Sequence, residues 1–208
     1  MLILPSLLEY SAFDLNRRIK SLNENGKNEI HIDTVCQNFA RGRRIMMSLS
    51  VKSVLEHLLI QLKHRPLLVT IHIMGNIEDL VSVYQFFAGY HFEPNWQYRI
   101  YLPLNSELAF TSLETMTNVR IGNWFDIDQW DIKTDLSQYL YSTLLLMTVK
   151  AGLSGQTLLP ETKQDAFELA IKNPNINFIF DGGWSCLFDT DVENVDLVSY
   201  TSYWRKNS

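Results

Sequence analysis

Short apolar runs alternate with amphipathic segments along most of the chain. Glu29–Val35 and Leu67–Met74 are β-branched and apolar, and each is followed by residues whose apolar positions recur three and four apart. This alternation predicts βα units around a parallel sheet. The expected strands are Leu2–Pro5, Glu29–Val35, Leu67–Met74, Tyr98–Leu104, Val119–Ile127, Ser142–Val149, Asn177–Phe180 and Val195–Thr201.

Helical patterns occupy most of the intervals between these strands. Leu15, Ile19 and Leu22 share one face of the first helix, and Gly26 is a suitable C-terminal stop. Asn76 is a suitable N-cap for a later helix, which carries Asp79 in its first turn. Further helical patterns cover Val51–Leu62, Glu107–Met116, Ile132–Tyr139 and the segment that Pro160 opens and Asn173-Pro174 ends.

Eight strands and roughly seven helices predict an α/β protein with a (β/α)₈ barrel, or TIM barrel. The chain of 208 residues shows no linker, repeat or low-complexity segment, so residues 1–208 are expected to form a single domain. The pattern ends just after the eighth strand, which predicts a short or missing last outer helix. The flank exposed in this way suggests a homo-oligomer.

Composition narrows the classes of function. The formal net charge of −5 and the absence of a basic run longer than Arg41–Arg44 argue against a nucleic-acid partner. No apolar run is long enough to span a bilayer, and the N-terminus has no signal-peptide pattern. Two cysteines, Cys36 and Cys186, do not make a disulfide framework. A cytoplasmic protein without a membrane partner is therefore expected.

Polar side chains gather at the carboxyl ends of three expected strands. These are His31 and Asp33 on one strand, His72 on the next, and Asp181 before two glycines on a later strand. A parallel barrel brings the carboxyl ends of its strands together at one rim, where catalytic groups collect. Two imidazoles and two carboxylates meeting there predict a site for one divalent metal ion. The two carboxylates could move a proton to and from a carbon next to a carbonyl.

The chain resembles the ribulose-phosphate 3-epimerase family over nearly its whole length. Six motifs carry the resemblance and occur in the family's order. They are Ile3–Leu8, Ile30–Asp33, Thr70–Met74, Leu146–Val149 with Gly152–Gln156, Phe180–Gly183 and Val198–Arg205.

The resemblance implies a metal-dependent epimerase of a ketose phosphate, ribulose 5-phosphate being the leading substrate. It implies Asp33 and Asp181 as the two catalytic bases on opposite faces of the substrate. The implied metal ligands are His31, Asp33, His72 and Asp181, and the ion would be zinc, manganese, iron or cobalt. The implied substrate-binding residues are Ser6, His72, Met74, Met147, Gly152, Ser154, Gly155, Gly182, Gly183 and Thr201.

The chain departs from the family in three loops. The loop after the His-x-Asp strand keeps only Phe39, Lys150-Ala151 replaces a Glu-Pro pair, and Tyr200-Thr201 replaces a Gly-Ser pair. Glycine at the last position lets backbone amides approach an anion closely. These departures and the short C-terminal end keep an alternative open. It is a catalytically impaired family member that binds a sugar phosphate or a protein partner.

Overall fold

Eight strands form a closed barrel in which each strand is the neighbour of the next and β8 pairs in parallel with β1. The computed structural model describes residues 1–104, 113, 115–137, 139, 142–153, 155–185, 188, 191–200 and 203–204. The strands are β1 Ile3–Leu7, β2 Glu29–Val35, β3 Leu67–Met74, β4 Trp96–Pro103, β5 Val119–Phe125, β6 Thr143–Met147, β7 Asn177–Asp181 and β8 Val195–Ser199. The predicted (β/α)₈ class is confirmed.

Five helices accompany the strands within the described residues. They are α1 Ala12–Glu24, α2 Gln37–Arg43, α3 Val51–Leu62, α4 Ile77–Gly89 and α5 Pro160–Lys172. The sequence did not predict α2, because a helix of seven residues that contains Gly42 is too short for a recognisable apolar stripe. Within the described part of the chain, no helix combines the length and the apolar character needed to span a bilayer.

The helix predicted at Ile132–Tyr139 is wrong for the described residues, which form turns and irregular chain. Side chains of this segment bond to nearby backbone instead: the amide of Lys133 donates to the Asp131 carboxylate at 2.8 Å, and the amide of Ser137 donates to the Asp135 carboxylate at 3.0 Å. Such local bonds compete with helical hydrogen bonds. The helix predicted at Glu107–Met116 lies largely outside the described residues.

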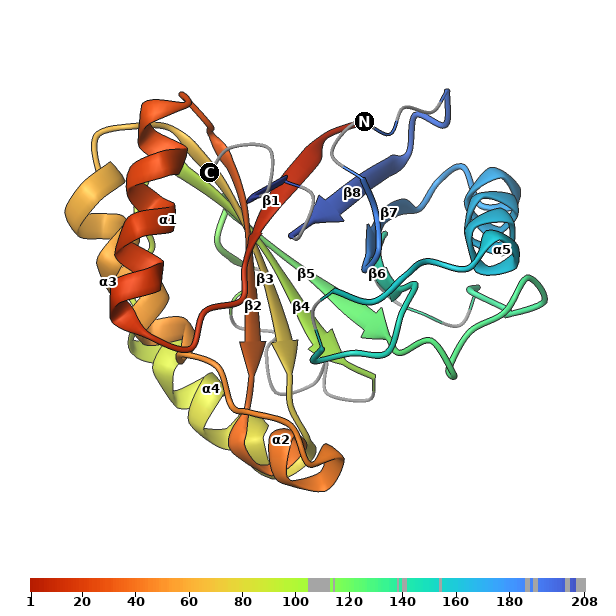
Figure 1. Ribbon diagram of the computed structural model, residues 1–208, viewed down its shortest axis with the longest axis horizontal. Helices are drawn as coiled ribbons and strands as arrows, with labels where there is room; N and C mark the ends of the chain where they lie inside the picture. The colour runs from red at the N-terminus through yellow and green to blue at the C-terminus, as the bar shows by residue number, and fades with distance from the viewer. Residues whose placement is uncertain are drawn as a thin grey trace. The chain divides into compact units, whose positions relative to one another are not determined.

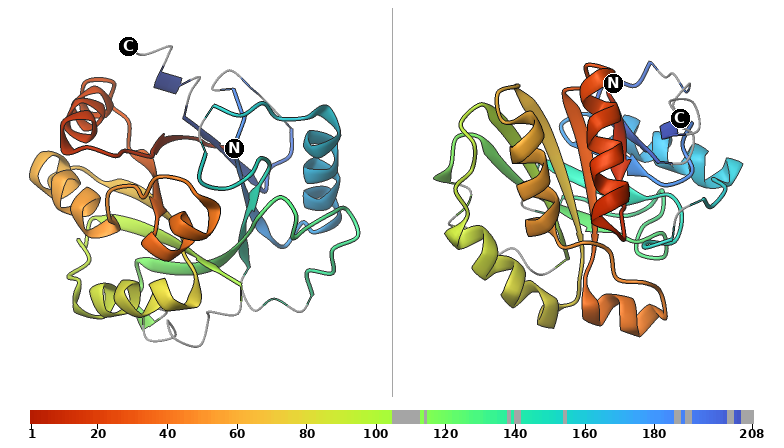
Figure 2. Two further views of the ribbon diagram at one scale, coloured as in Figure 1. Left: turned by 60° about the horizontal axis from the view of Figure 1, so that its bottom comes forward. Right: turned by 60° about the vertical axis from the view of Figure 1, so that its left-hand side comes forward.

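The chain divides into two compact units, the first of which comprises Ser6–Ile121. In this unit α1, α3 and α4 lie along one face of the sheet formed by β2, β3 and β4 (Figures 1 and 2). Leu15, Ile19 and Leu22 of α1 are fully buried, which confirms the predicted inner face. Figure 2 shows α2 beyond the carboxyl ends of β2 and β3.

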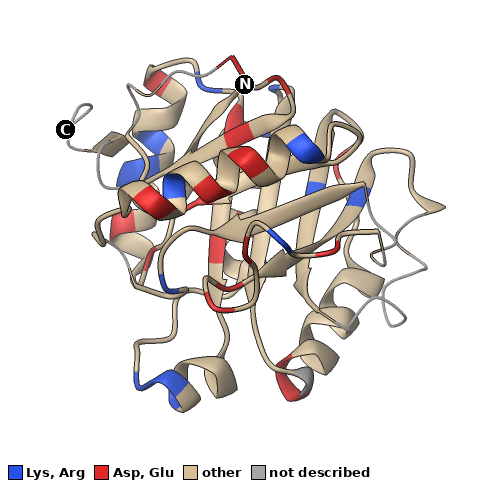
Figure 3. Cartoon of the chain, turned by 90° about the vertical axis from the view of Figure 1, so that its right-hand side faces the viewer, with Lys and Arg blue, Asp and Glu red and all other residues tan. Residues whose placement is uncertain are grey.

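The second unit comprises Met1–Pro5 and Gly122–Ser208. Here α5 buries Ala166, Leu169 and Ala170, and Phe167 contacts Phe180 of β7 with ring centroids 5.4 Å apart. Acidic and basic residues both occur along α5, which lies on the side of the molecule shown in Figure 3. The helix is therefore amphipathic, and its outer face carries no single-sign charge.

Candidate metal centre

Strand register brings four of the predicted site residues together in the first unit. Parallel pairing sets Ser6 of β1 opposite His31 of β2, and Asp33 of β2 opposite His72 of β3. Because side chains alternate between the two faces of a strand, His31 and Asp33 share one face, and Ile32 between them points to the other. The polar site residues therefore share one face of two strands that are mostly apolar and buried.

The Asp33 carboxylate is the centre of this group. Its Oδ1 lies 3.2 Å from Nε2 of His31 and 3.2 Å from Nδ1 of His72, and its Oδ2 accepts a hydrogen bond of 2.5 Å from the hydroxyl of Ser6. Asp33 is only 5% exposed, and both imidazoles are fully buried. Three polar side chains thus converge on one carboxylate away from solvent.

Electrostatics keep Asp33 ionised. Burial alone would raise the pKa of its carboxyl group, but the charge and hydrogen bond of His31 and the hydrogen bond of His72 outweigh this effect. The pKa therefore lies well below the ordinary value of 3.8. A buried carboxylate that stays charged next to two imidazoles is a suitable environment for a cation.

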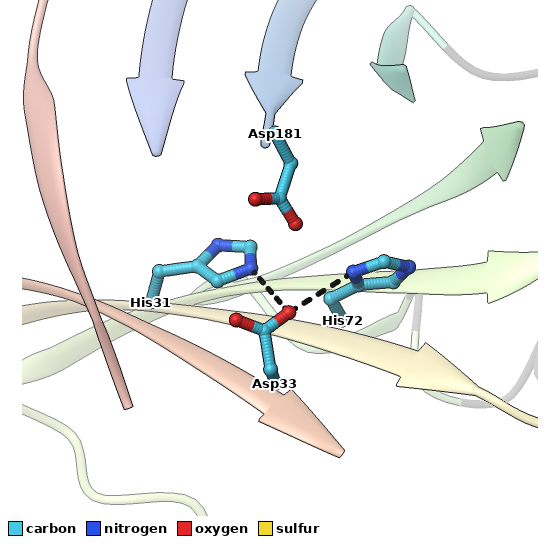
Figure 4. A group of neighbouring side chains, drawn as sticks. All are labelled: His31, Asp33, His72 and Asp181. Atoms are coloured by element: carbon cyan, nitrogen blue, oxygen red, sulfur yellow. Dashed lines mark hydrogen bonds and ion pairs between the residues drawn. The ribbon is translucent and has the colours of Figure 1, made fainter. Parts of the chain in front are cut away.

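Asp181 at the end of β7 is the fourth member of a group that could hold a metal ion. One ligand atom from each of His31, Asp33, His72 and Asp181 lies within 4.8 Å of all the others, and all four residues are buried (Figure 4). Metal–nitrogen and metal–oxygen bonds of 2.0–2.2 Å put the ligand atoms of a tetrahedral site about 3.4 Å apart, so the most separated atoms of this group would have to approach by about 1 Å. The donor set and its spacing therefore fit one divalent ion with small adjustments of the side chains.

Gly182 and Gly183 follow Asp181 and have a steric reason to be glycine. Their φ angles are +107° and +77°, in the region that L side chains rarely adopt. A Cβ atom on Gly182 would lie 2.2 Å from Cγ2 of Val149, and one on Gly183 would lie 2.7 Å from the amide nitrogen of Leu158. The two glycines let β7 end directly against the loop after β6. Their predicted substrate contact remains a prediction.

The loop after β6 carries other predicted substrate contacts. Gly152 and Gly155 also have positive φ angles, of +89° and +79°, so this segment turns at both glycines. Among the described residues, apart from the chain neighbours of Gly155, nothing lies within 4 Å of a Cβ placed on that glycine. Ser154 and Thr201, also predicted to bind substrate, lie outside the described residues.

The two predicted pocket methionines are buried on the faces that carry site residues. Met74 is 1% exposed and lies two residues after His72 on β3; Met147 is 4% exposed and pairs in register with Asp181. Side chains in register on parallel strands point to the same face of the sheet. Both placements agree with the predicted lining role and equally with a role in the core.

Sequence reasoning missed the roles of two polar residues, one that bonds to the end of β2 and one that bonds to the first turn of α2. The hydroxyl of Ser48 accepts a hydrogen bond of 2.8 Å from the amide of Val35. The buried carboxylate of Asp79 accepts from the amides of Asn38, Phe39 and Asn76 at 3.0–3.1 Å. The Asn76–Asp79 spacing is that of a capping box, a signal for part of this role. No local pattern marks Ser48.

Cys36 is expected to react slowly with alkylating agents. Burial and the nearby Asp79 carboxylate raise the pKa of its thiol to about 12. At pH 8 the thiolate fraction should be about a thousandfold smaller than for an ordinary cysteine. Iodoacetamide labelling of the folded Cys186→Ser variant should therefore be about a thousandfold slower than labelling in urea. The rate should rise about tenfold per pH unit between pH 8 and 10; a plateau near pH 9 would contradict the raised pKa.

Comparison with protein-family models and with curated proteins finds no match for this chain. The resemblance to ribulose-phosphate 3-epimerases therefore rests on the motifs quoted above.

Proposed function

We propose that the protein is a metal-dependent epimerase that inverts the carbon next to the ketone of a ketose phosphate. The observation that carries the proposal is the buried group of His31, Asp33, His72 and Asp181. Two carboxylates within one such group fit a reaction in which one base removes a proton and another returns a proton to the opposite face. Asp33 and Asp181 would be these bases.

Each side chain of the group has a separate task in this proposal. Ser6 and the two imidazoles hold the Asp33 carboxylate through the contacts described above. Burial of the group keeps bulk water away from the deprotonated ketose. A bound zinc, manganese, iron or cobalt ion would supply the positive charge that stabilises the oxygen of the deprotonated ketose. The phosphate would bind at the Gly152–Gly155 loop.

The proposal extends to the setting of the enzyme. We propose a cytoplasmic homo-oligomer that acts on a small sugar phosphate, with ribulose 5-phosphate as the first substrate to test. Sedimentation of the purified protein would test the oligomeric state by itself.

Solvent deuterium exchange tests the reaction directly. The protein, loaded with each candidate metal in turn, is incubated in D₂O with ribulose 5-phosphate, and deuterium at the carbon next to the ketone is followed by NMR. Asp181→Asn is expected to lower exchange by at least about a thousandfold, because a general base contributes on the order of 10²–10⁴. Asp128→Asn, which changes an exposed carboxylate, should exchange normally. Near-normal exchange in Asp181→Asn would remove its role as a base.

One observation favours the alternative of a binding protein without turnover. Lys150-Ala151 and Tyr200-Thr201 stand where the epimerase family has Glu-Pro and Gly-Ser, in loops that the resemblance implies for phosphate binding. Metal binding with no deuterium exchange on any ketose phosphate tested would support a protein that binds a sugar phosphate or a protein partner. Exchange on any of them would support the epimerase.

A further inference from the structure

Thr148, the residue just after β6, is hydrogen-bonded to the backbone at the end of β7. Its amide donates to the carbonyl of Asp181 at 2.7 Å. Its hydroxyl lies 3.0 Å from the same carbonyl and 2.7 Å from the carbonyl of Gly182. Thr148 is only 2% exposed, so both peptide groups that flank the Cα of Gly182 bond to one buried side chain.

Trp184 fixes the direction in which this hydroxyl donates. The indole N–H of Trp184 donates to the Thr148 hydroxyl oxygen at 2.8 Å. Because the indole can only donate, the hydroxyl proton must point elsewhere, toward the two carbonyls. The carbonyl of Trp184 in turn accepts from the hydroxyl of Ser199 on β8 at 3.2 Å. The network therefore joins the ends of β6, β7 and β8.

The surroundings of Trp184 keep its indole in place. Its ring lies 5.5 Å from that of Phe167 and 5.8 Å from that of Phe180, measured between centroids, and the side chain is buried. Two rings from α5 and β7 thus flank the indole. A donor held by packing in this way loses little conformational entropy when it bonds.

We propose that Thr148 and Trp184 are positioning residues that set the orientation of the Asp181 carboxylate. The Cα of Asp181 carries both the side chain and the carbonyl that Thr148 holds, so a displacement of this carbonyl would move the Cα and the carboxylate with it. The glycines after Asp181 leave the peptide that contains this carbonyl without the restraint of a Cβ atom, and Thr148 supplies that restraint. The inference rests on the proposed function, since it gives Asp181 a ligand and base role.

The test compares Thr148→Val, Thr148→Ser and Trp184→Phe with the unchanged chain. Valine keeps the volume of threonine but loses the hydroxyl, and serine keeps the hydroxyl. Phenylalanine loses the indole donor and part of the ring volume but keeps an aromatic ring between Phe167 and Phe180. Cobalt(II) is the probe, because its visible spectrum reports ligand geometry. Thr148→Val is expected to lower cobalt affinity about tenfold, the smaller effect typical of groups that orient a ligand, and to change the spectrum. Thr148→Ser should restore both.

Trp184→Phe keeps the test decisive if the valine variant fails to fold. It should also lower cobalt affinity, and the Thr148→Val/Trp184→Phe double variant should lose little more than Thr148→Val alone, because the Trp184 indole acts through the Thr148 hydroxyl that valine has already removed. In deuterium exchange, the variants should have a lower kcat, and their KM should stay within about twofold of that of the unchanged chain.

If no form of the protein exchanges deuterium, the proposed function fails while the cobalt measurements still test the positioning. Unchanged cobalt affinity and spectrum in Trp184→Phe and in folded Thr148→Val would overturn the inference.

Discussion

Asp33→Asn is expected to lower the affinity for a divalent metal ion at least about a hundredfold, a larger effect than that of removing a group that only orients a ligand. The amide keeps the shape of the carboxylate but loses the negative charge that His31 and His72 face at 3.2 Å. The NH₂ group of the amide is also a donor, so it cannot accept the hydrogen bond that a carboxylate oxygen accepts from the Ser6 hydroxyl or from an imidazole N–H. Isothermal titration with zinc or manganese at pH 7 measures the loss.

The same variant should remain folded without metal. The amide that replaces the carboxylate buries no charge. The unfolding temperature of the metal-free protein should therefore change by no more than about 4 °C, which corresponds to a change of about 1 kcal/mol in the free energy of unfolding for a chain of this size. The favourable interactions of the Asp33 carboxylate are present above pH 3.8 and are lost as the pH falls below that value. At pH 7 the comparison therefore isolates the charge.

Two variants complete the Asp33 experiment. Ser6→Ala removes only the hydrogen bond of the hydroxyl to Asp33 and should weaken metal binding by about tenfold. Asp14→Asn, on the exposed surface of α1, should bind metal normally. Metal affinity in Asp33→Asn equal to that of the unchanged chain would show that Asp33 is no ligand.

The metal group could be predicted from the sequence because its signals are local. His31 and Asp33 stand two residues apart in a β-branched run, so they must share one face of a strand whatever the rest of the fold. His72 and Asp181 also end apolar runs, and a parallel barrel collects such ends at one rim. Each predicted strand end falls within two residues of its observed position, which was sufficient for the site residues.

The supports of the group could not be predicted, since they depend on contacts between residues far apart in sequence. Thr148 and Trp184 are 36 positions apart in the sequence, and the Asp79 carboxylate accepts a hydrogen bond from the amide of Asn38, 41 positions away. The sequence around a threonine does not show which carbonyl will accept a hydrogen bond from its hydroxyl. The register between strands determines these partners, and register depends on packing across the whole sheet.

Turns were the least predictable part of the fold. In the segment that starts at Asp131, the aspartate and threonine side chains accept hydrogen bonds from local backbone amides, so its apolar residues did not produce a helix. Conversely, α2 formed although its sequence has little periodicity, because the Asp79 carboxylate binds amides in its first turn. Both errors arise where side-chain hydrogen bonds, rather than apolar patterning, decide the backbone.

Gly182→Ala is expected to destabilise the protein by about 2–5 kcal/mol, the largest stability effect expected of the changes considered. A positive φ costs a residue with a Cβ about 1–2 kcal/mol, and forcing a methyl group into a packed site costs about 1–3 kcal/mol more. The new Cβ would lie 2.2 Å from Cγ2 of Val149, so one of the two segments must move. Urea unfolding followed by circular dichroism measures the change.

Gly26→Ala provides the matched control for Gly182→Ala. Gly26 also has a positive φ, of +63°, but nothing lies within 4 Å of a Cβ placed there, so its substitution should cost only about 1 kcal/mol. The difference between the two variants isolates the clash with Val149. Adding Val149→Ala to Gly182→Ala should recover at least about 1 kcal/mol relative to the sum of the single changes. Equal destabilisation by Gly182→Ala and Gly26→Ala would mean that backbone conformation alone requires the glycine. The close approach of β7 to the loop after β6 would then have no part in holding Asp181.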